Sequence, residues 1–488
     1  MKKKKIKAPI VVIGASSLGV ELISELRRNK NDILVVDKQF SKNSSQAVLR
    51  NQHTLQSGVL QLLNKNLEKS TSNVRKDYLN IAENYRDLID KYSRTNLISD
   101  EPSCIEITTN NIYENDNEVK KSECAIVRYI ENLNSLGFKE FSKKIDINTK
   151  QSLGDFSTQE EYNQLYFELP DKSIDYDRIL QKRKGELALQ NKTKGDVLFL
   201  NKSKTVHVNA KNNHIITDKY EIEANYIFIA AGIGTKKVLK EFIVDYDRSE
   251  SSAFILMKTK NSICRNLKFS TFAKYIEVKD GNDVNYKFLF AAKHGAESLK
   301  SSEEFLVVGN ANNILKKKSS PIKKKSIPSN YNSFEIKFDS EIKDGEQTLL
   351  NDYASAFAEA NTICKNDKDK FNTCVLKHGE VKYHPYINKV PNSFISLGHP
   401  GLASTSSKIA QKLIKNLEKE IKATRKLKRF KLSNVKIDQN ERNKVIEETE
   451  KEAEKIIKLG SLIDNSDSIS KEHSAWFRTS KHIEITKN

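Results

Sequence analysis

Cysteine is scarce in this chain, and long apolar runs are absent. The five cysteines among 488 residues are odd in number and scattered, and no two have metal-ligand spacing, so we expect reduced thiols in the core: Cys104, Cys124, Cys264, Cys364 and Cys374. No apolar run approaches the roughly 20 residues that span a bilayer. The first predicted strand begins within a few residues of Met1, which leaves no room for a signal-peptide core. These absences predict a cytoplasmic protein.

Charge is plentiful by contrast, with a formal net charge of +19 and 30% charged residues. Lysine runs lie at 2–5, 316–318 and 323–325, and within 415–431. Such runs can bind phosphates. The whole chain is rich in Lys and Asn, however, so a composition bias explains them more simply. We therefore expect a small-molecule partner and favour nucleic acid less, although the basic charge keeps it open.

The segment Ile10–Asp37 carries the clearest motif. The apolar run Ile10–Ile13 predicts a strand buried on both faces of a parallel sheet, and a Gly turn follows. Helical spacing of apolar residues comes next, at Leu18, Leu22, Ile23 and Leu26. A second apolar run, 33–36, ends at Asp37. This order is typical of a βαβ unit whose helix begins at a bound pyrophosphate and whose acid accepts a hydrogen bond from a ribose hydroxyl.

One position departs from the usual G-x-G-x-x-G pattern. Ser16 stands between Gly14 and Gly19, where the second glycine is expected. That glycine lets the backbone approach the pyrophosphate closely. A serine adds a side chain there, yet its hydroxyl could also donate to phosphate.

Further along, the chain alternates between helical and strand-like patterns. A long helix is predicted at about 59–92, and a run of short strands leads into the apolar strand 224–232. The alternation on either side of Asp280–Asp283 predicts a hairpin, and 394–398 predicts a last buried strand followed by a helix. A charged helix is expected at about 440–459.

Four segments together resemble the FAD-dependent oxidoreductases of the D-amino acid oxidase type. Within this family, the segments look most similar to the branch that contains L-2-hydroxyglutarate dehydrogenase and glycerol-3-phosphate dehydrogenase. The first segment is the unit Ile10–Asp37. Arg50–Gly58, R-N-Q-H-T-L-Q-S-G, is similar to the family's segment under the flavin, with Gln56 where several members have His and His53 where Gly is usual. Ala230–Gly232 resembles the strand ending in A-A-G, and His399–Ser404 occupies the place of the final Gly-rich loop.

The resemblance implies an α/β fold with a Rossmann-like FAD-binding domain around a parallel sheet. An interleaved α+β substrate domain with an antiparallel sheet would complete it. We expect the FAD-binding domain at 1–100, 175–250 and 390–420, the substrate domain at 101–174 and 251–389, and a charged, partly helical extension at 421–488. The cofactor-binding residues that it implies are Gly14, Ala15, Ser16, Ser17, Leu18, Gly19, Asp37, Lys38, Arg50, Asn51, Gln56, Ser57, Val206, Ala231, Gly232, Gly401, Leu402, Ala403 and Ser404.

The implied chemistry is oxidation of a C–O or C–N bond of a small acid or amine, by hydride transfer to FAD. A histidine is the favoured base because its pKa lies near neutrality. His53 and His399 fall in the flavin-proximal segments, and His378 and His384 come next. We expect the active site between the two domains, over the flavin ring. Two alternatives stay open: a non-catalytic binding or scaffold module with this fold, and a flavoenzyme acting on a modified nucleotide in tRNA.

Overall fold

The computed structural model describes the chain in parts, and for some strands it describes the backbone alone. These parts are residues 3–28, 32–37, 54–55, 57, 85–90, 97–110, 144–145, 162–169, 171–189, 197–200, 203, 205–231, 235–239, 252–259, 270–280, 283–293, 304–310, 373–378, 386–390, 393–399, 406–423, 435–464 and 482–483. The predicted helix at 59–92 lies mostly outside them. No helix in these parts is both long enough and apolar enough to cross a membrane.

The chain divides into two compact units, each made of separated segments. The first unit comprises 1–49, 176–250 and 379–469, and the second comprises 50–175, 251–378 and 470–488. The division expected from the sequence differs mainly in four stretches: 50–100 and 470–488 belong to the second unit, and 379–389 and 421–469 belong to the first. Residues 50–100 join the second unit, where Thr54–Leu55 (β3) pairs with Lys172–Ser173 (β7). Residues up to 469 join the first unit, because a C-terminal helix packs onto it.

The first unit is built on a sheet with a parallel centre. Its order is β17-β18-β11-β1-β2-β8, and the last five of these strands are mutually parallel. The strands are β1 (Lys4–Ile13), β2 (Ile33–Val36), β8 (Val197–Leu200), β11 (Tyr220–Ile229), β17 (Tyr386–Lys389) and β18 (Ile395–His399). The apolar runs of β1 and β2 are buried on both faces, as their composition predicts. The prediction that the strand near Phe394 joins the sheet of the Ile10 strand is confirmed.

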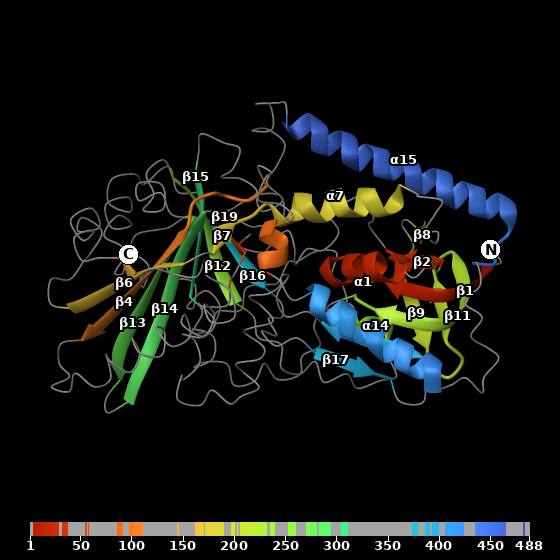
Figure 1. The fold of residues 1–488 in the computed structure, drawn as a ribbon, viewed down its shortest axis with the longest axis horizontal. Helices are drawn as coiled ribbons and strands as arrows, with labels where there is room; N and C mark the ends of the chain where they lie inside the picture. The colour runs from red at the N-terminus through yellow and green to blue at the C-terminus, as the bar shows by residue number, and fades with distance from the viewer. Residues whose placement is uncertain are drawn as a thin grey trace. The chain divides into compact units, whose positions relative to one another are not determined.

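Helices cover this sheet, and a small antiparallel extension widens it. α1 (Ser17–Arg28) packs on β1 and β2 and against α7 (Tyr176–Ala188) and α14 (Ser406–Ala423). Figure 1 shows these three helices beside the strands. The predicted helical face of α1 is confirmed, since Leu18, Leu22, Ile23 and Leu26 are buried. The extension consists of β9 (Thr205–Asn209) and β10 (His214–Thr217), which pairs with the amino half of β11.

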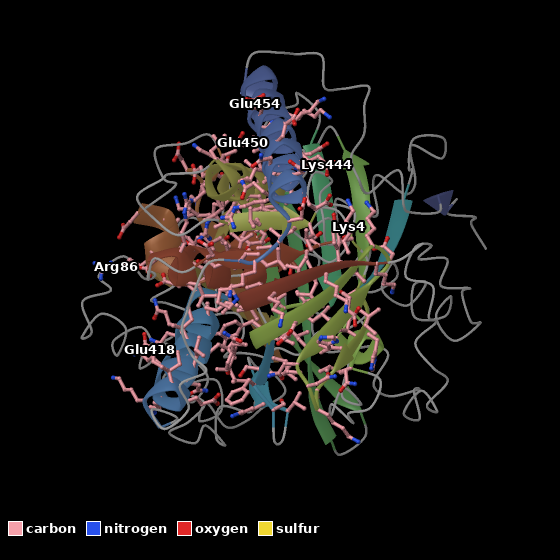
Figure 2. All side chains as sticks on the ribbon, turned by 90° about the vertical axis from the view of Figure 1, so that its right-hand side faces the viewer. Lys4, Arg86, Glu418, Lys444, Glu450 and Glu454 are labelled. Carbon is pink, nitrogen blue, oxygen red and sulfur yellow. The ribbon has the colours of Figure 1, made fainter. Side chains whose placement is uncertain are left out.

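The charged C-terminal helix, α15 (Gln439–Asp464), belongs to this unit. It packs against α7 and against β8, the strand that ends the sheet within the described part of the chain. Figure 2 shows Lys444, Glu450 and Glu454 along it, with Lys4 near its amino end. Lys4 forms an ion pair there with Glu441, which also accepts a hydrogen bond of 2.8 Å from the Tyr220 hydroxyl.

The second unit contains a mainly antiparallel sheet, described chiefly by its backbone. Its order is β19-β16-β12-β15-β14-β13-β4-β6-β5, and only the pair β4–β13 is parallel among the pairs described. The strands are β4 (Ser103–Asn110), β5 (Lys144–Ile145), β6 (Tyr162–Leu169), β12 (Ser252–Thr259), β13 (Thr271–Asp280), β14 (Asp283–Lys293), β15 (Glu304–Asn310), β16 (Thr373–His378) and β19 (His482–Ile483). β13 and β14 form the predicted hairpin, with Asp280 opposite Asp283. The α/β fold with a separate antiparallel sheet is thereby confirmed.

Candidate functional site

The turn after β1 has a constrained backbone. Gly14 has φ of +94°, a region that residues with a side chain rarely adopt. A Cβ atom on Gly14 would lie 2.7 Å from the carbonyl oxygen of Ala230, which follows β11. The Gly14 N–H donates to the carbonyl of Val36 at the end of β2, with N···O 3.0 Å. The turn is thus held between the carboxyl ends of two neighbouring strands and has no room for a larger residue.

Gly19 brings the first helix against this turn. A Cβ atom there would lie 1.9 Å from the Gly14 carbonyl oxygen, so helix and turn approach more closely than any side chain permits. The helix begins directly after the turn, since the Ser16 carbonyl accepts from the Val20 N–H at 2.8 Å. The first N–H groups of a helix have no partner within it. These N–H groups of α1 lie beside the Gly14 turn, where they could donate hydrogen bonds to a bound anionic group.

Asp37 contacts the same turn. Its Oδ2 accepts a hydrogen bond from the Ala15 N–H, with a distance of 2.6 Å. The predicted strand-end acid is therefore close to the glycine turn, as a dinucleotide site requires. Its role toward a ribose hydroxyl stays a prediction.

The site lies where the strand order of the sheet reverses. From β1 the chain proceeds to β2 and β8 on one side, and β11 and β18 lie on the other. Gly14 follows β1 and Ala230 follows β11, so both flank this switch point, where ligands bind in open α/β sheets. The Ser16 hydroxyl donates weakly to the Ala230 carbonyl across it, at 3.4 Å. The departure at Ser16 is thus accommodated without loss of the Gly14 conformation.

Three buried hydroxyls at the same edge of the sheet lack a hydrogen-bond partner among the described residues. Ser203 follows β8, Thr235 begins the short helix α8 (Thr235–Val238) after β11, and Ser406 begins α14 after β18. Each is only 1% exposed. Buried polar groups in proteins are nearly always satisfied. The tight glycine turn, the adjacent acid and these hydroxyls together fit a polar ligand of dinucleotide type.

The second unit holds a buried carboxyl that sequence reasoning missed. Asp171 accepts hydrogen bonds at Oδ1 from the Ser57 N–H, at 2.7 Å, and from the Ser57 hydroxyl. Complete burial raises the pKa of Asp171 to about 6, although the bonds from Ser57 act to lower it. Its backbone carbonyl accepts from the hydroxyls of Ser103, at 2.6 Å, and Ser270, at 3.0 Å. An acid that titrates near neutrality is characteristic of functional sites.

Much of the predicted site lies outside the described residues. This holds for Lys38, Arg50, Asn51, His53, Gln56, Gly232, Gly401, Leu402, Ala403 and Ser404, and for His384. His399 and Val206 are described by their backbone alone, at the end of β18 and within β9, and His378 likewise in β16. The structure brings together Gly14 to Gly19, Asp37 and the end of β11 with Ala231, whereas Ser57 belongs to the second unit.

This architecture is similar to that of several solved structures, although sequence comparisons find no match. No protein-family model matches the sequence, and no curated protein does. Among solved structures, L-amino acid deaminase from Proteus vulgaris, with its specific insertion deleted, aligns with a TM-score of 0.51 and 11% identity, over 86% of this chain and 91% of its own. Iminodiacetate oxidase from Chelativorans sp. BNC1 aligns with a TM-score of 0.51 and 13% identity, over 84% and 95%.

A third similar structure is L-alpha-glycerophosphate oxidase from Mycoplasma pneumoniae, reduced with dithionite and with FAD bound. It aligns with a TM-score of 0.50 and 12% identity, over 84% of this chain and 95% of its own. Structural similarity at such low sequence identity establishes the fold alone. The chain therefore has the fold of the oxidases and dehydrogenases of the D-amino acid oxidase type, as the sequence resemblance implied.

Proposed function

We propose that this protein binds FAD non-covalently and uses it to oxidise a C–O or C–N bond of a small acid or amine. The observation that carries the proposal is the Gly14 turn at the switch point of the parallel sheet. Gly14 adopts a positive φ and Gly19 lies against it, so helix α1 begins where a pyrophosphate can be received. The fold shared with FAD-containing glycerophosphate oxidase supports this assignment.

The residues that would hold the cofactor come from both sides of the switch point. Backbone N–H groups from Ser16 to Gly19 would donate to the pyrophosphate, and Asp37, which already accepts from the Ala15 N–H of the turn, would accept from a ribose hydroxyl. The edge of β11, at Ala230 and Ala231, would border the same cofactor. Bound FAD supplies a two-electron acceptor, and the protein supplies position and electrostatics.

The remaining task is to hold the substrate and to take one proton from its hydroxyl or amine. We propose His53 and His399 for this proton, with His378 and His384 as the next candidates. The deaminase and the two oxidases among the similar structures are named for small acids and amines, which supports this substrate class.

The first test asks whether FAD binds where we place it. The purified protein should be yellow, and the cofactor released on denaturation should be FAD. Gly14→Leu should abolish binding, because the side chain would collide with the Ala230 carbonyl. Asn213→Leu is the matched control: Asn213 also has a positive φ, of 53°, in the turn between β9 and β10, so the variant carries similar strain elsewhere. A Gly14→Leu protein that kept full FAD would refute the placement.

The second test concerns the chemistry. Flavin reduction is followed anaerobically with a panel of amino acids and 2-hydroxy acids, for the parent, His53→Ala and His399→Ala. We expect at least one variant to bind FAD normally and to reduce it at least a hundredfold more slowly, within the range for loss of a general base. Parent-like rates in both would transfer the role to His378 or His384. A yellow parent protein that no substrate reduces would favour the non-catalytic module.

A further inference from the structure

The exposed face of α14 carries a row of four lysines. Lys412, Lys415, Lys419 and Lys422, together called the basic stripe, are all exposed. They recur every three or four residues, close to the 3.6 residues of a helical turn, so they lie along one line of the helix. At about 1.5 Å per residue, the basic stripe extends about 15 Å along the helix axis.

The basic stripe keeps its positive charge. Within the described part of the chain, none of its four lysines forms an ion pair. Of the two acids in α14, Glu420 lies on another side of the helix and pairs with Lys389 of β17, at 2.6 Å. Glu418 is exposed and borders the basic stripe at one edge, so one acid stands beside four lysines.

The Lys-rich composition of the chain does not by itself produce such a row. α15 also carries exposed lysines, yet its exposed positions mix both signs of charge. Lys444–Glu448 and Lys455–Glu452 pair along α15, at 3.9 and 3.3 Å, as is usual for a solvated helix. In α14 the lysines instead gather on one line, which indicates an anionic partner outside the chain.

The opposite face of α14 narrows the kind of partner. Its apolar residues Ile409, Leu413 and Leu417 are buried, and the helix packs against α1 and β18. A helix that binds a membrane surface inserts an apolar face, and the apolar face of α14 is already used in the fold. The helix also contains no aromatic residue on which unpaired bases could stack. A row of positive charges without these features fits the phosphates of a paired duplex, where one phosphate follows another at about 1.7 Å of axis.

We propose that the basic stripe is a docking surface for the phosphate backbone of a nucleic-acid duplex. Each lysine would donate to a phosphate as a point charge, without reading the sequence of the bases. The inference goes beyond the proposed oxidation and does not depend on a bound flavin.

The experiment measures how binding to a short fluorescent DNA duplex depends on salt, by fluorescence anisotropy. The parent is compared with a stripe variant and a control variant, each with four exposed lysines of the first unit changed to Gln. Both variants therefore lose the same net charge. The stripe variant combines Lys412→Gln, Lys415→Gln, Lys419→Gln and Lys422→Gln, and the control combines Lys211→Gln, Lys219→Gln, Lys444→Gln and Lys451→Gln. Because Gln has nearly the helix propensity of Lys, the melting temperatures of all three proteins should agree.

The expected result follows from counterion release. Each phosphate contact on a duplex contributes about 0.9 to the slope of log K against log salt concentration. We expect the stripe variant to lose about 3.6 of the parent's slope, so that between about 50 and 200 mM salt the parent's affinity falls about a hundredfold more than that of the variant. The single variant Lys415→Gln should lose about 0.9, and the control variant should lose clearly less than the stripe variant. FAD affinity should be the same in all of these proteins.

Three outcomes would overturn the docking surface. Equal losses of slope in the stripe and control variants would show that net charge alone explains the binding. A parent that does not bind the duplex at about 50 mM salt would have no such surface. Binding of the parent and the control to phosphatidylserine vesicles in preference to the duplex, lost only in the stripe variant, would assign the lysines to a membrane instead.

Discussion

The buried carboxyl of Asp171 makes the stability of the second unit depend on pH in an unusual direction. Its pKa is raised from 3.8 to about 6, chiefly by burial. The folded protein therefore holds this proton more tightly than the unfolded chain does. The contribution to stability is greatest below the unfolded pKa and is lost as the pH rises through the folded pKa. The shift of about two units corresponds to a loss of about 3 kcal/mol between about pH 4 and pH 6.

Asp171→Asn should remove this loss. The amide oxygen can still accept from the Ser57 N–H and hydroxyl, and no charge needs to be buried. The second carboxyl oxygen, Oδ2, has no partner within the described residues, so the new NH₂ group also stays unpaired, at a cost of about 1 kcal/mol. The variant should therefore be less stable than the parent by about 1 kcal/mol near pH 4 and more stable by about 2 kcal/mol at neutral pH.

The assay is urea unfolding of both proteins at a series of pH values, with hydrogen exchange of the peptide that contains Ser57 as a local readout. Asp100→Asn is the control, because Asp100 is exposed in the same unit. Its difference from the parent should be small at every pH. A difference between Asp171→Asn and the parent that does not change with pH would refute the reasoning. A variant less stable at neutral pH would show that the bonds from Ser57 outweigh burial.

Three further outcomes follow from the first unit. Ser16→Gly should keep or strengthen FAD affinity, measured by titration, because close backbone approach returns; a large loss would identify the Ser16 hydroxyl as a phosphate ligand. Arg183→Met should lower the free energy of unfolding by about 3–5 kcal/mol, because Glu21 stays buried as an uncompensated charge; in urea denaturation, adding Glu21→Leu should recover most of the loss, and no recovery would contradict this account. Asp32→Ala should expose 435–464 to limited proteolysis, at a cost of about 1–2 kcal/mol, because Asp32 accepts from the Val435 N–H at 3.1 Å; unchanged cleavage would show that α15 is held by its packing alone.

The glycine turn could be predicted because its signals are local. Ile10–Ile13 and Ile33–Val36 are short all-apolar runs, and the helix between them repeats its apolar residues at helical spacing. Burial of both runs in one parallel sheet follows from these patterns alone. The conformation of Gly14 is likewise a consequence of the tight turn that links strand and helix.

Asp171 could not be found in this way. Asp171 stands in a polar stretch without periodicity, and its burial arises from the pairing of β3 with β7, which are far apart in the sequence. Its burial comes from long-range packing, which a single sequence does not encode in any local pattern.

The packing of α15 was concealed for a different reason. The sequence predicts a charged helix with Glu/Lys pairs, and pairs such as Lys455–Glu452, at 3.3 Å, are present. Among its described side chains, those of 439–455, the buried residues are Glu441, Val445, Thr449 and Ala453, and the partly buried Ile446 packs beside them. The Thr449 hydroxyl donates chiefly to the Val445 carbonyl of its own helix, at 2.6 Å, and lies 3.3 Å from the Phe199 carbonyl of β8. Hydrophobic spacing therefore gives little sign of it.

The bridge between Lys7 and Lys436 has a consequence for the synthesis of this protein. β1 leaves the ribosome well before its neighbour β11, which lies about 210 residues later, and the helix that completes the unit ends at Asp464. At roughly 5–20 residues per second, that takes on the order of 20–90 seconds. Until β11 has emerged, the apolar run Ile10–Ile13 lacks its partner on that side, and the bridge from Lys7 to Lys436 forms later still. The yield of folded protein should therefore depend on chaperones that hold the emerging chain, and slower, cooler expression should favour it.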